Sequence, residues 1–263
     1  HQEKIAQFLK TLPQLQCTCA IDLTNVSLGK YSLYGLITTK KSNQLTEVVA
    51  KIDQNSFVKS VDVLLFSDPW VNKWHPENVI VDLSERKKPL QRTEKPDTTY
   101  KAVTLDALNR NIIKMLMENS RISFSNMARN LKVSLNTVTQ RYRFLKENNV
   151  LNLSTISIDL KKLGYKGIID VYVKVDKKSG LSQTEKQLLA IPNLVFLTTF
   201  VGGFYDLRCA NIIADFEDII HLKKQFYSMS NIQRAEFYFN DLGTPWPIDF
   251  VGQCLLEWEF ANY

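Results

Sequence analysis

A polar and basic helix face near the middle of the chain carries side chains that can hydrogen-bond to base pairs. Between an N-cap at Ser134 and Asn149, apolar residues recur at helical spacing and leave the opposite face to amides, hydroxyls and guanidiniums. Amides such as Asn136 and Gln140 can pair bidentately with adenine, and Arg141 can pair with guanine. Residues near the start of the helix should reach base edges, whereas the later basic ones suit phosphates. A merely solvated face is the alternative interpretation. The residues expected to contact DNA are Ser134, Asn136, Thr137, Thr139, Gln140, Arg141, Arg143 and Lys146.

Two shorter helices are predicted before this one, from about Leu105 to Asn119 and from about Ser123 to Leu131. Thr104 is a candidate N-cap of the first helix, and Ser123 or Ser125 of the second. The third helix should pack inward through the stripe Leu135, Val138, Tyr142 and Leu145. Three short amphipathic helices joined by tight turns have the layout of a helix-turn-helix, which presents one helix to a DNA groove.

Positive charge is concentrated around the same helices. From Ser84 to Lys146 there are 14 Lys/Arg against 5 Asp/Glu, a balance of +9, whereas the remaining residues hold 19 against 22, a balance of −3. A basic segment of this kind is the electrostatic footprint of nucleic-acid binding. Double-stranded DNA is therefore the expected partner.

The segment from Leu105 to Tyr165 resembles the Lrp/AsnC family of bacterial and archaeal transcription regulators. LDALNRNIIKMLMENSRIS resembles the family's first helix and the turn after it, VSLNTVTQRYRFLKENNVL its recognition helix, and ISIDLKKLGY its hinge strand. The resemblance implies sequence-specific DNA binding without catalysis. It also implies a ferredoxin-like βαββαβ domain that mediates assembly and often senses an amino acid.

The residues after the hinge carry the pattern of such a domain. β-Branched and apolar residues alternate in the expected strands, and Pro192 and an N-cap at Asp215 delimit the expected helices. The order βαββαβ builds an antiparallel sheet with two helices on one face. Strands are predicted at Gly167–Val175, Val195–Val201, Asp206–Ile213 and Arg234–Phe239, and helices at Ser182–Ile191 and from Asp215 to about Ser228.

The N-terminal region repeats this pattern, and Pro13-Gln14-Leu15 echoes Pro192-Asn193-Leu194. The first copy has no counterpart of the strand Gly167–Val175, which would be central in its sheet. We therefore expect that the chain begins inside a longer natural protein, or that an equivalent strand comes from elsewhere. Helices are predicted at Ile5–Leu12 and Leu45–Gln54, and strands at Gln16–Leu23, Tyr31–Thr38 and Val58–Phe66.

These patterns predict an α+β chain in which two ferredoxin-like (βαββαβ) domains flank a small all-α winged/helix-turn-helix domain. The expected boundaries are a first ferredoxin-like domain at 1–82, a linker at 83–100, a helix-turn-helix domain at 101–154, and a hinge strand with the second ferredoxin-like domain at 155–263. The two sensor copies should pair with each other. With one DNA-binding unit per chain, a palindromic site requires a homodimer or a larger homo-oligomer.

In the family, effectors bind between sensor domains near a turn of the type Gly-x-x-Asp. The stretch Gly203-Phe204-Tyr205-Asp206 matches this turn, which makes Gly203, Tyr205 and Asp206 candidate effector-binding residues. A carboxylate can hold the ammonium group of an amino acid. The first copy reads Gly29-Lys30-Tyr31-Ser32, where serine replaces the acid. An ordinary hairpin turn is the alternative interpretation.

No motif indicates catalysis, a cofactor or a metal. Of the four cysteines, Cys17, Cys19, Cys209 and Cys254, the first two lie two residues apart on one predicted strand. Because no Cys/His companion at zinc-site spacing accompanies them, Cys17 and Cys19 are expected to be small buried residues and not a metal or redox pair. The sequence contains no phosphate-binding glycine loop, HExxH motif or GxSxG elbow. No apolar run is long enough to span a bilayer, so no membrane partner and a cytoplasmic location are expected.

Two other function classes remain open. Siroheme decarboxylases look like Lrp/AsnC proteins, yet they act on a tetrapyrrole with basic and histidine side chains. A non-catalytic interaction scaffold would keep the helix-turn-helix only as a packing unit. The polar and basic face after Ser134, together with only three histidines, favours DNA over a tetrapyrrole, and DNA binding with a salt titration would separate all three classes.

Overall fold

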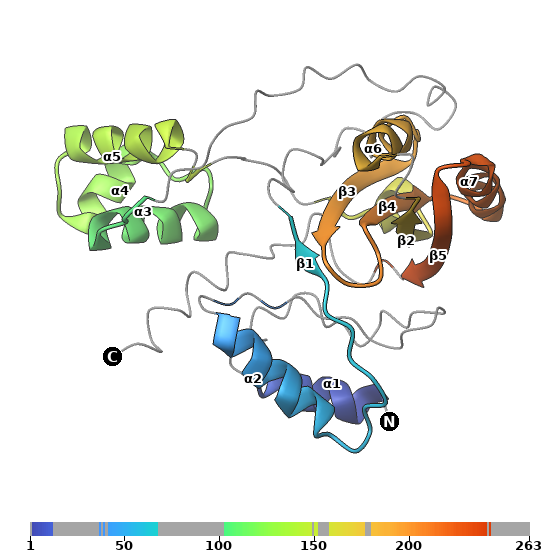
Figure 1. The fold of residues 1–263 in the computed structure, drawn as a ribbon. Helices are drawn as coiled ribbons and strands as arrows, with labels where there is room; N and C mark the ends of the chain where they lie inside the picture. Colours follow the sequence, from blue (N-terminus) through green and yellow to red (C-terminus); the bar gives the residue numbers. More distant parts are fainter. Residues whose placement is uncertain are drawn as a thin grey trace. The chain divides into compact units, whose positions relative to one another are not determined.

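The computed structural model describes residues 2–12, 37, 39, 42–67, 103–148, 150–151, 158–176, 180–240 and 242. The chain divides into two units, one made of residues 1–94 and 157–250 and the other of residues 95–156 and 251–263. The predicted linker lies outside the described residues, as do the predicted strands at 16–23 and most of 31–38. The elements are labelled in Figure 1.

The second unit contains the three predicted helices, which are α3 (Ala107–Glu118), α4 (Phe124–Leu131) and α5 (Leu135–Glu147). Their apolar faces meet in one core, so the prediction of three short amphipathic helices is confirmed (Figure 1). The residues buried in this core are Ile112, Ile113, Met127, Ala128, Val138 and Leu145.

Side-chain caps fix where these helices begin. Ser134 caps α5, as the sequence predicted, and of the two candidates for α4 it is Ser123 that forms the cap; each accepts a hydrogen bond from the backbone N–H of the third residue of its helix. The prediction that Thr104 caps the first helix was wrong, because Asp106 accepts from Asn109 N and α3 begins after it. Lys132 joins α4 to α5 in the left-handed conformation, with φ 55°, which gives a tight turn.

The first unit contains the predicted βαββαβ order. Its strands β2, β3, β4 and β5 form an antiparallel sheet in the order β3-β4-β2-β5, and two helices connect them (Figure 1). The elements are β2 (Gly167–Val175), α6 (Leu181–Leu189), β3 (Leu194–Val201), β4 (Leu207–Ile213), α7 (Phe216–Ser228) and β5 (Ile232–Asn240). Asp215 caps α7 in a capping box with Asp218.

The core of this domain lies between the sheet and the helices α6 and α7. Alternate residues of β2 point into it, together with Leu188 of α6 and both Leu222 and Phe226 of α7. The remaining residues of β2 lie on the second face of the sheet, which contains buried polar groups. Tyr205 of the predicted effector turn packs against this face, where its ring contacts that of Tyr172.

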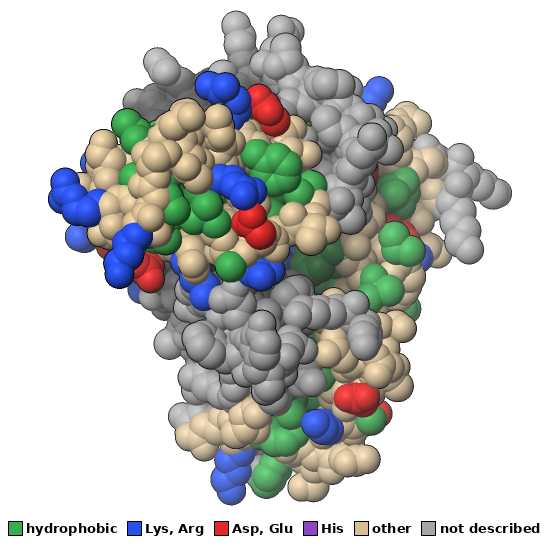
Figure 2. Space-filling model, turned by 90° about the vertical axis from the view of Figure 1, so that its left-hand side faces the viewer, with side chains coloured by type: hydrophobic (Ala, Val, Ile, Leu, Met, Phe, Trp, Pro, Cys, Tyr) green, Lys and Arg blue, Asp and Glu red, His purple; other side chains and the backbone are tan. Residues whose placement is uncertain are grey.

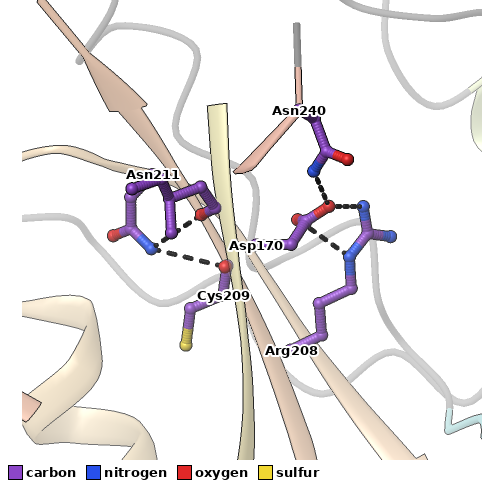
Figure 3. A network of polar contacts seen from close by, with 6 residues as sticks. Asp170, Arg208, Cys209, Asn211 and Asn240 are labelled. Atoms are coloured by element: carbon purple, nitrogen blue, oxygen red, sulfur yellow. Dashed lines mark hydrogen bonds and ion pairs between the residues drawn. The ribbon is translucent and has the colours of Figure 1, made fainter. Parts of the chain in front are cut away.

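On the second face, Asp170 of β2 forms a buried ion pair with Arg208 of β4. Arg208 Nε and Nη2 donate to the two carboxylate oxygens at 3.0 and 2.9 Å, and Asn240 Nδ2 donates to Asp170 Oδ2 at 2.8 Å (Figure 3). Asn211 lies on the opposite side of the strands, where its Nδ2 donates to the carbonyls of Ile169 and Cys209. Bidentate pairing satisfies a charge that is 2% exposed.

The N-terminal region contributes the helices α1 (Gln2–Lys10) and α2 (Ser42–Asp53), close to the predicted spans. Leu9 of α1, Leu12 just after it, and Val48 and Ile52 of α2 are the buried residues of a separate apolar cluster. The duplication is therefore visible in part, through its helices.

The predicted closing strand at 58–66 differs from the structure. Only β1 (Leu65–Phe66) is a strand, and it pairs antiparallel with the edge strand β3 of the second copy, opposite Val201 and Phe200. Ser67 N continues the ladder by donating to Thr199 O at 2.8 Å. The edge of β3 offers unpaired backbone groups, and β1 satisfies them. In the segment that resembles the family's hinge strand, residues Lys161–Leu163 form a 3-10 helix that ends at Gly164, and residues 152–157 before it lie outside the described residues.

Candidate nucleic-acid interface

The outer face of α5 presents the amide and basic side chains that the sequence singled out. Asn136, Gln140, Arg143 and Lys146 are exposed, whereas Val138 and Leu145 on the opposite face are fully buried. At about 100° per residue, Asn136, Gln140 and Arg143 fall within an arc of about 60°. The helix therefore holds two amides and a guanidinium side by side, pointing away from the core.

Hydroxyl groups at the start of α5 are engaged in local hydrogen bonds. Ser134 Oγ accepts from Thr137 N at 3.0 Å and lies 2.8 Å from Thr137 Oγ1, and Thr139 Oγ1 donates to Leu135 O at 2.9 Å. Thr137 and Thr139 are half-buried. These contacts fix the first turn of the helix, so Asn136 within that turn and Gln140 after it have a defined direction.

Arg141 holds α5 to α3. Its Nη2 lies 2.9 Å from Oδ2 of Asp106, whose Oδ1 caps α3 at the same time. The sequence grouped Arg141 with the residues that read bases, but the structure directs its guanidinium toward the start of α3. One carboxylate thus joins the cap of the first helix to the side of the third.

Leu135 was predicted in the inner stripe, and this prediction was wrong. Its side chain is 51% exposed, because it occupies the first position of α5, where the helix has not yet entered the core. The other three members of the stripe pack as predicted: Val138 and Leu145 are buried, and the ring of Tyr142 lies 4.9 Å from that of Phe124. An exposed leucine at the start of a helix in the major groove can contact the methyl group of thymine.

The described part of this unit, residues 103–148, is basic. It contains eight Lys/Arg against three Asp/Glu, a balance of +5. In Figure 2, which faces this unit, Lys and Arg side chains stand around its surface, with hydrophobic side chains and fewer Asp and Glu side chains among them. Such a surface attracts a polyanion and loses that attraction as salt screens it.

In the predicted effector turn, the structure gives the acidic residue partners within the domain. Asp206 Oδ1 accepts from Lys174 Nζ at 2.9 Å, and Asp206 Oδ2 accepts from Val175 N at 2.9 Å. Gly203 has φ +81°, and a Cβ there would lie 2.7 Å from Leu64 Cδ2. Both residues therefore have roles in the fold: Asp206 fastens the turn to β2, and Gly203 makes room for the segment that leads into β1.

Tyr205, the third residue of this group, is buried against the second face of the sheet. Its hydroxyl donates to Glu236 Oε2 at 2.5 Å, and the hydroxyl of Tyr238 donates to the same oxygen at 2.7 Å. Burial, followed by the hydrogen bond to Glu236, raises the pKa of Tyr205. Burial alone would raise the pKa of Glu236 as well, but hydrogen bonds from Tyr205 and Tyr238 and the charge of Arg234 lower it below its ordinary value.

Two ion pairs, one within the helix-turn-helix unit and one within the ferredoxin-like domain, were not predicted from the sequence. The Asp106–Arg141 pair joins residues 35 positions apart, and Asp170–Arg208 joins residues 38 positions apart, so neither follows from local spacing. The only available signal was the presence of acids at a helix start and inside an apolar strand, where a carboxylate requires a partner. Cys209 is buried with a free thiol, and burial raises its pKa, whereas Cys17 and Cys19, which were predicted to be small buried residues, lie outside the described residues. Among the described residues, no group of His, Cys, Asp and Glu could hold a metal ion, and no helix is long and apolar enough to cross a membrane.

Residues 105–146 match the AsnC-type helix-turn-helix domain. Over 131 residues the chain is 31% identical to the HTH-type transcriptional regulator Ptr1 of Methanocaldococcus jannaschii, a match that covers 49% of this chain and 86% of that protein. It is also 31% identical over 99 residues to the HTH-type transcriptional regulator LrpC of Bacillus subtilis, covering 38% of this chain and 68% of that protein. Among solved structures, that of E. coli AsnC aligns with a TM-score of 0.48 and 20% identity over 52% of this chain and 92% of that one.

Proposed function

The chain belongs to the Lrp/AsnC family of helix-turn-helix transcription regulators, and we propose that α5 is the helix with which it reads double-stranded DNA. The observation that carries this proposal is the exposed arc of Asn136, Gln140 and Arg143 on a helix whose other side is anchored in a core. Two helices and their caps hold that arc rigidly, as direct readout requires.

Each side chain of the arc has a distinct role in this proposal. Asn136 and Gln140 lie in the first half of α5 and pair with base edges in the major groove, adenine being the base that amides recognise bidentately. Arg143 and Lys146 lie further along and bind phosphates, which positions the helix without selecting sequence. Leu135, exposed at the first turn, contacts a thymine methyl group.

Arg141 supports DNA binding indirectly, by holding α5 against α3. With its guanidinium on Asp106, it sets the angle between α3 and α5 instead of reading a base. Ser134, Thr137 and Thr139 fix the first turn in the same way through their local hydrogen bonds. The specificity of the protein then depends on few side chains, each held by a residue that does not touch DNA.

We extend the proposal to the remaining properties of the regulator. It acts without catalysis or cofactor, in the cytoplasm, as a homodimer or larger homo-oligomer on a palindromic site. Modulation by a small amino-acid effector at Gly203, Tyr205 and Asp206 stays a prediction. An effector ammonium group would have to compete with Lys174 for Asp206. Calorimetric titration with the twenty amino acids tests it, and heat from none of them would count against it.

Selection of DNA fragments from a random pool tests the role of α5. The wild-type protein should enrich one motif, and Gln140→Ala should still bind but lose discrimination at one position of that motif, at a cost of about 1–3 kcal/mol. Arg143→Ala, the control from the same arc, should weaken binding to all sequences alike. Enrichment of the same motif by Gln140→Ala with unchanged discrimination would remove Gln140 from the interface.

A further inference from the structure

The helix α7 carries an apolar row on its outer side, away from the core of its domain. Phe216 is 74% exposed, Ile220 44% and Tyr227 69%, although Leu222 and Phe226 on the inner side of the same helix are buried. In Figure 1 this helix lies beside β5 at the margin of the sheet. Large apolar side chains gathered in this way on an exposed helix mark an interaction surface.

The spacing of this row is that of a coiled-coil seam. Phe216, Ile220, Lys223 and Tyr227 follow one another at intervals of four, three and four residues, which is the a/d pattern of a heptad. At about 100° per residue the four side chains lie within an arc of about 60°. Lys223 adds its aliphatic stem to the row, and its ammonium group lies 5.5 Å from the ring centroid of Phe237.

The charges that flank this seam specify both the partner and its direction. Glu217 follows Phe216 and Lys224 follows Lys223, so the two charges occupy equivalent positions on the same flank, one heptad apart. In an antiparallel pair of identical helices, Phe216 faces Tyr227 of the second copy and Ile220 faces its Lys223. Glu217 then lies next to Lys224 of the second copy, twice by symmetry. In a parallel pair the flanking contacts run from this position of one helix to the opposite flank of the other, so Glu217 and Lys224 would not meet and no charge pair would form.

We propose that α7 is a self-association surface on which the α7 helix of a second copy packs antiparallel along Phe216, Ile220, Lys223 and Tyr227. The pairing of β1 with β3 is made within one chain and already occupies that edge of the sheet. Joining two chains through α7 brings two helix-turn-helix units into one assembly. The proposal is independent of which DNA sequence α5 reads.

The seam is short, and this sets the expected strength of association. A helix of 13 residues is about 20 Å long, so two such helices bury less than the roughly 1,200 Å² of a standard stable interface. The assembly is therefore expected to form in a concentration-dependent manner. Sedimentation velocity of the 263-residue chain over a range of concentrations measures this directly.

Substitution of Ile220 tests the seam. Ile220→Asp places a charge at the centre of the pair and should raise the dissociation constant by about tenfold or more. Gln225→Asp adds the same charge at an exposed position of α7 outside the seam and should leave the constant unchanged. Equal melting temperatures of the two variants would show that both fold. A wild-type mass that never rises with concentration, or an Ile220→Asp mass equal to the wild type, would overturn the proposal.

Exchange of the flanking charges tests the direction of packing. Lys224→Glu alone puts two acids together and should weaken association, and Glu217→Lys combined with Lys224→Glu should restore it. Failure of the double variant to associate better than Lys224→Glu would overturn antiparallel packing. Binding of DNA by Ile220→Asp separates the two proposals. If Ile220→Asp is monomeric and still binds a half-site, both self-association through α7 and DNA reading by α5 are supported. If the wild-type chain assembles as expected but binds no DNA, only the proposed function is contradicted.

Discussion

The contact between Asp106 and Arg141 allows the cap of α3 and the charge that holds α5 to be separated experimentally. Asp106 Oδ1 accepts from Asn109 N at 2.8 Å, and Oδ2 lies 2.9 Å from Arg141 Nη2. Asp106→Asn keeps an oxygen for the cap, since Asn and Asp are comparable N-cap residues, and removes the charge. Asp106→Ala removes both contributions.

The size of each contribution follows from exposure. The side chains of Asp106 and Arg141 are 49% and 39% exposed, so their ion pair contributes about 0.2–1 kcal/mol to the free energy of unfolding of this unit. Loss of the cap costs about 1 kcal/mol more. Asp106→Asn should therefore cost less than about 1 kcal/mol and Asp106→Ala about 1–2 kcal/mol. Arg141→Ala should match Asp106→Asn, and the double variant should cost no more than either alone, because both remove the same interaction.

Amide hydrogen exchange of buried residues in α3 and α5 measures these differences within the helix-turn-helix unit. Arg143→Ala, which removes an exposed guanidinium from the outer face of the same helix, is the matched control and should leave exchange unchanged. The reasoning is refuted if Asp106→Asn costs as much as Asp106→Ala, or if the costs of Asp106→Asn and Arg141→Ala add in the double variant. The affinity for DNA should fall by similar factors in Asp106→Asn and Arg141→Ala.

Three further predictions concern the ferredoxin-like domain. Gly203→Ala should lower the free energy of opening β1 by about 1 kcal/mol or more, since its Cβ would lie 2.7 Å from Leu64 Cδ2. Gly202→Ala has a similar φ of +74° but nothing within 4 Å of its Cβ, so it controls for backbone strain. Equal amide exchange rates at Leu65 in the two variants would contradict this prediction. Asp170→Ala should cost about 3–5 kcal/mol in urea unfolding because the buried guanidinium of Arg208 loses the carboxylate that balances its charge, and a cost below about 1 kcal/mol would be incompatible with that role. The pKa of Glu236 is lowered on folding, so its contribution to stability is full above its ordinary pKa of 4.5 and is lost as pH falls through the folded value. Glu236→Gln should therefore reduce the loss of unfolding free energy at acidic pH. An unchanged loss in that variant would rule out Glu236 as a cause of the acid sensitivity.

The elements that the sequence predicted well are those whose signals are local. The βαββαβ order followed from alternation in strands such as Gly167–Val175 and from the cap at Asp215, and the helices of the DNA-binding unit from their apolar periodicity. Such signals depend on neighbours within one or two turns, so the chain itself displays them.

The features that escaped prediction depend on distant partners. Thr104 and Asp106 are both acceptable N-caps, and Arg141, which lies far along the chain, contacts Asp106. Leu135 has the spacing of a core residue but lies at the first position of its helix, outside the core. The strand expected at 58–66 is limited to Leu65–Phe66, where β3 offers an edge. Of the candidate DNA contacts, the exposed arc on α5 followed from periodicity, whereas the ion pair of Arg141 did not.

The most direct test of DNA recognition by α5 is a salt titration of binding to the selected DNA motif, carried out in parallel with the wild-type chain and Arg143→Ala. If the basic outer face of α5 lies against phosphates, the logarithm of the binding constant falls linearly with the logarithm of salt concentration, and the slope of the variant is smaller by about 1. Equal slopes for the two proteins, or affinity that does not respond to salt, would mean that this face of the helix does not meet DNA.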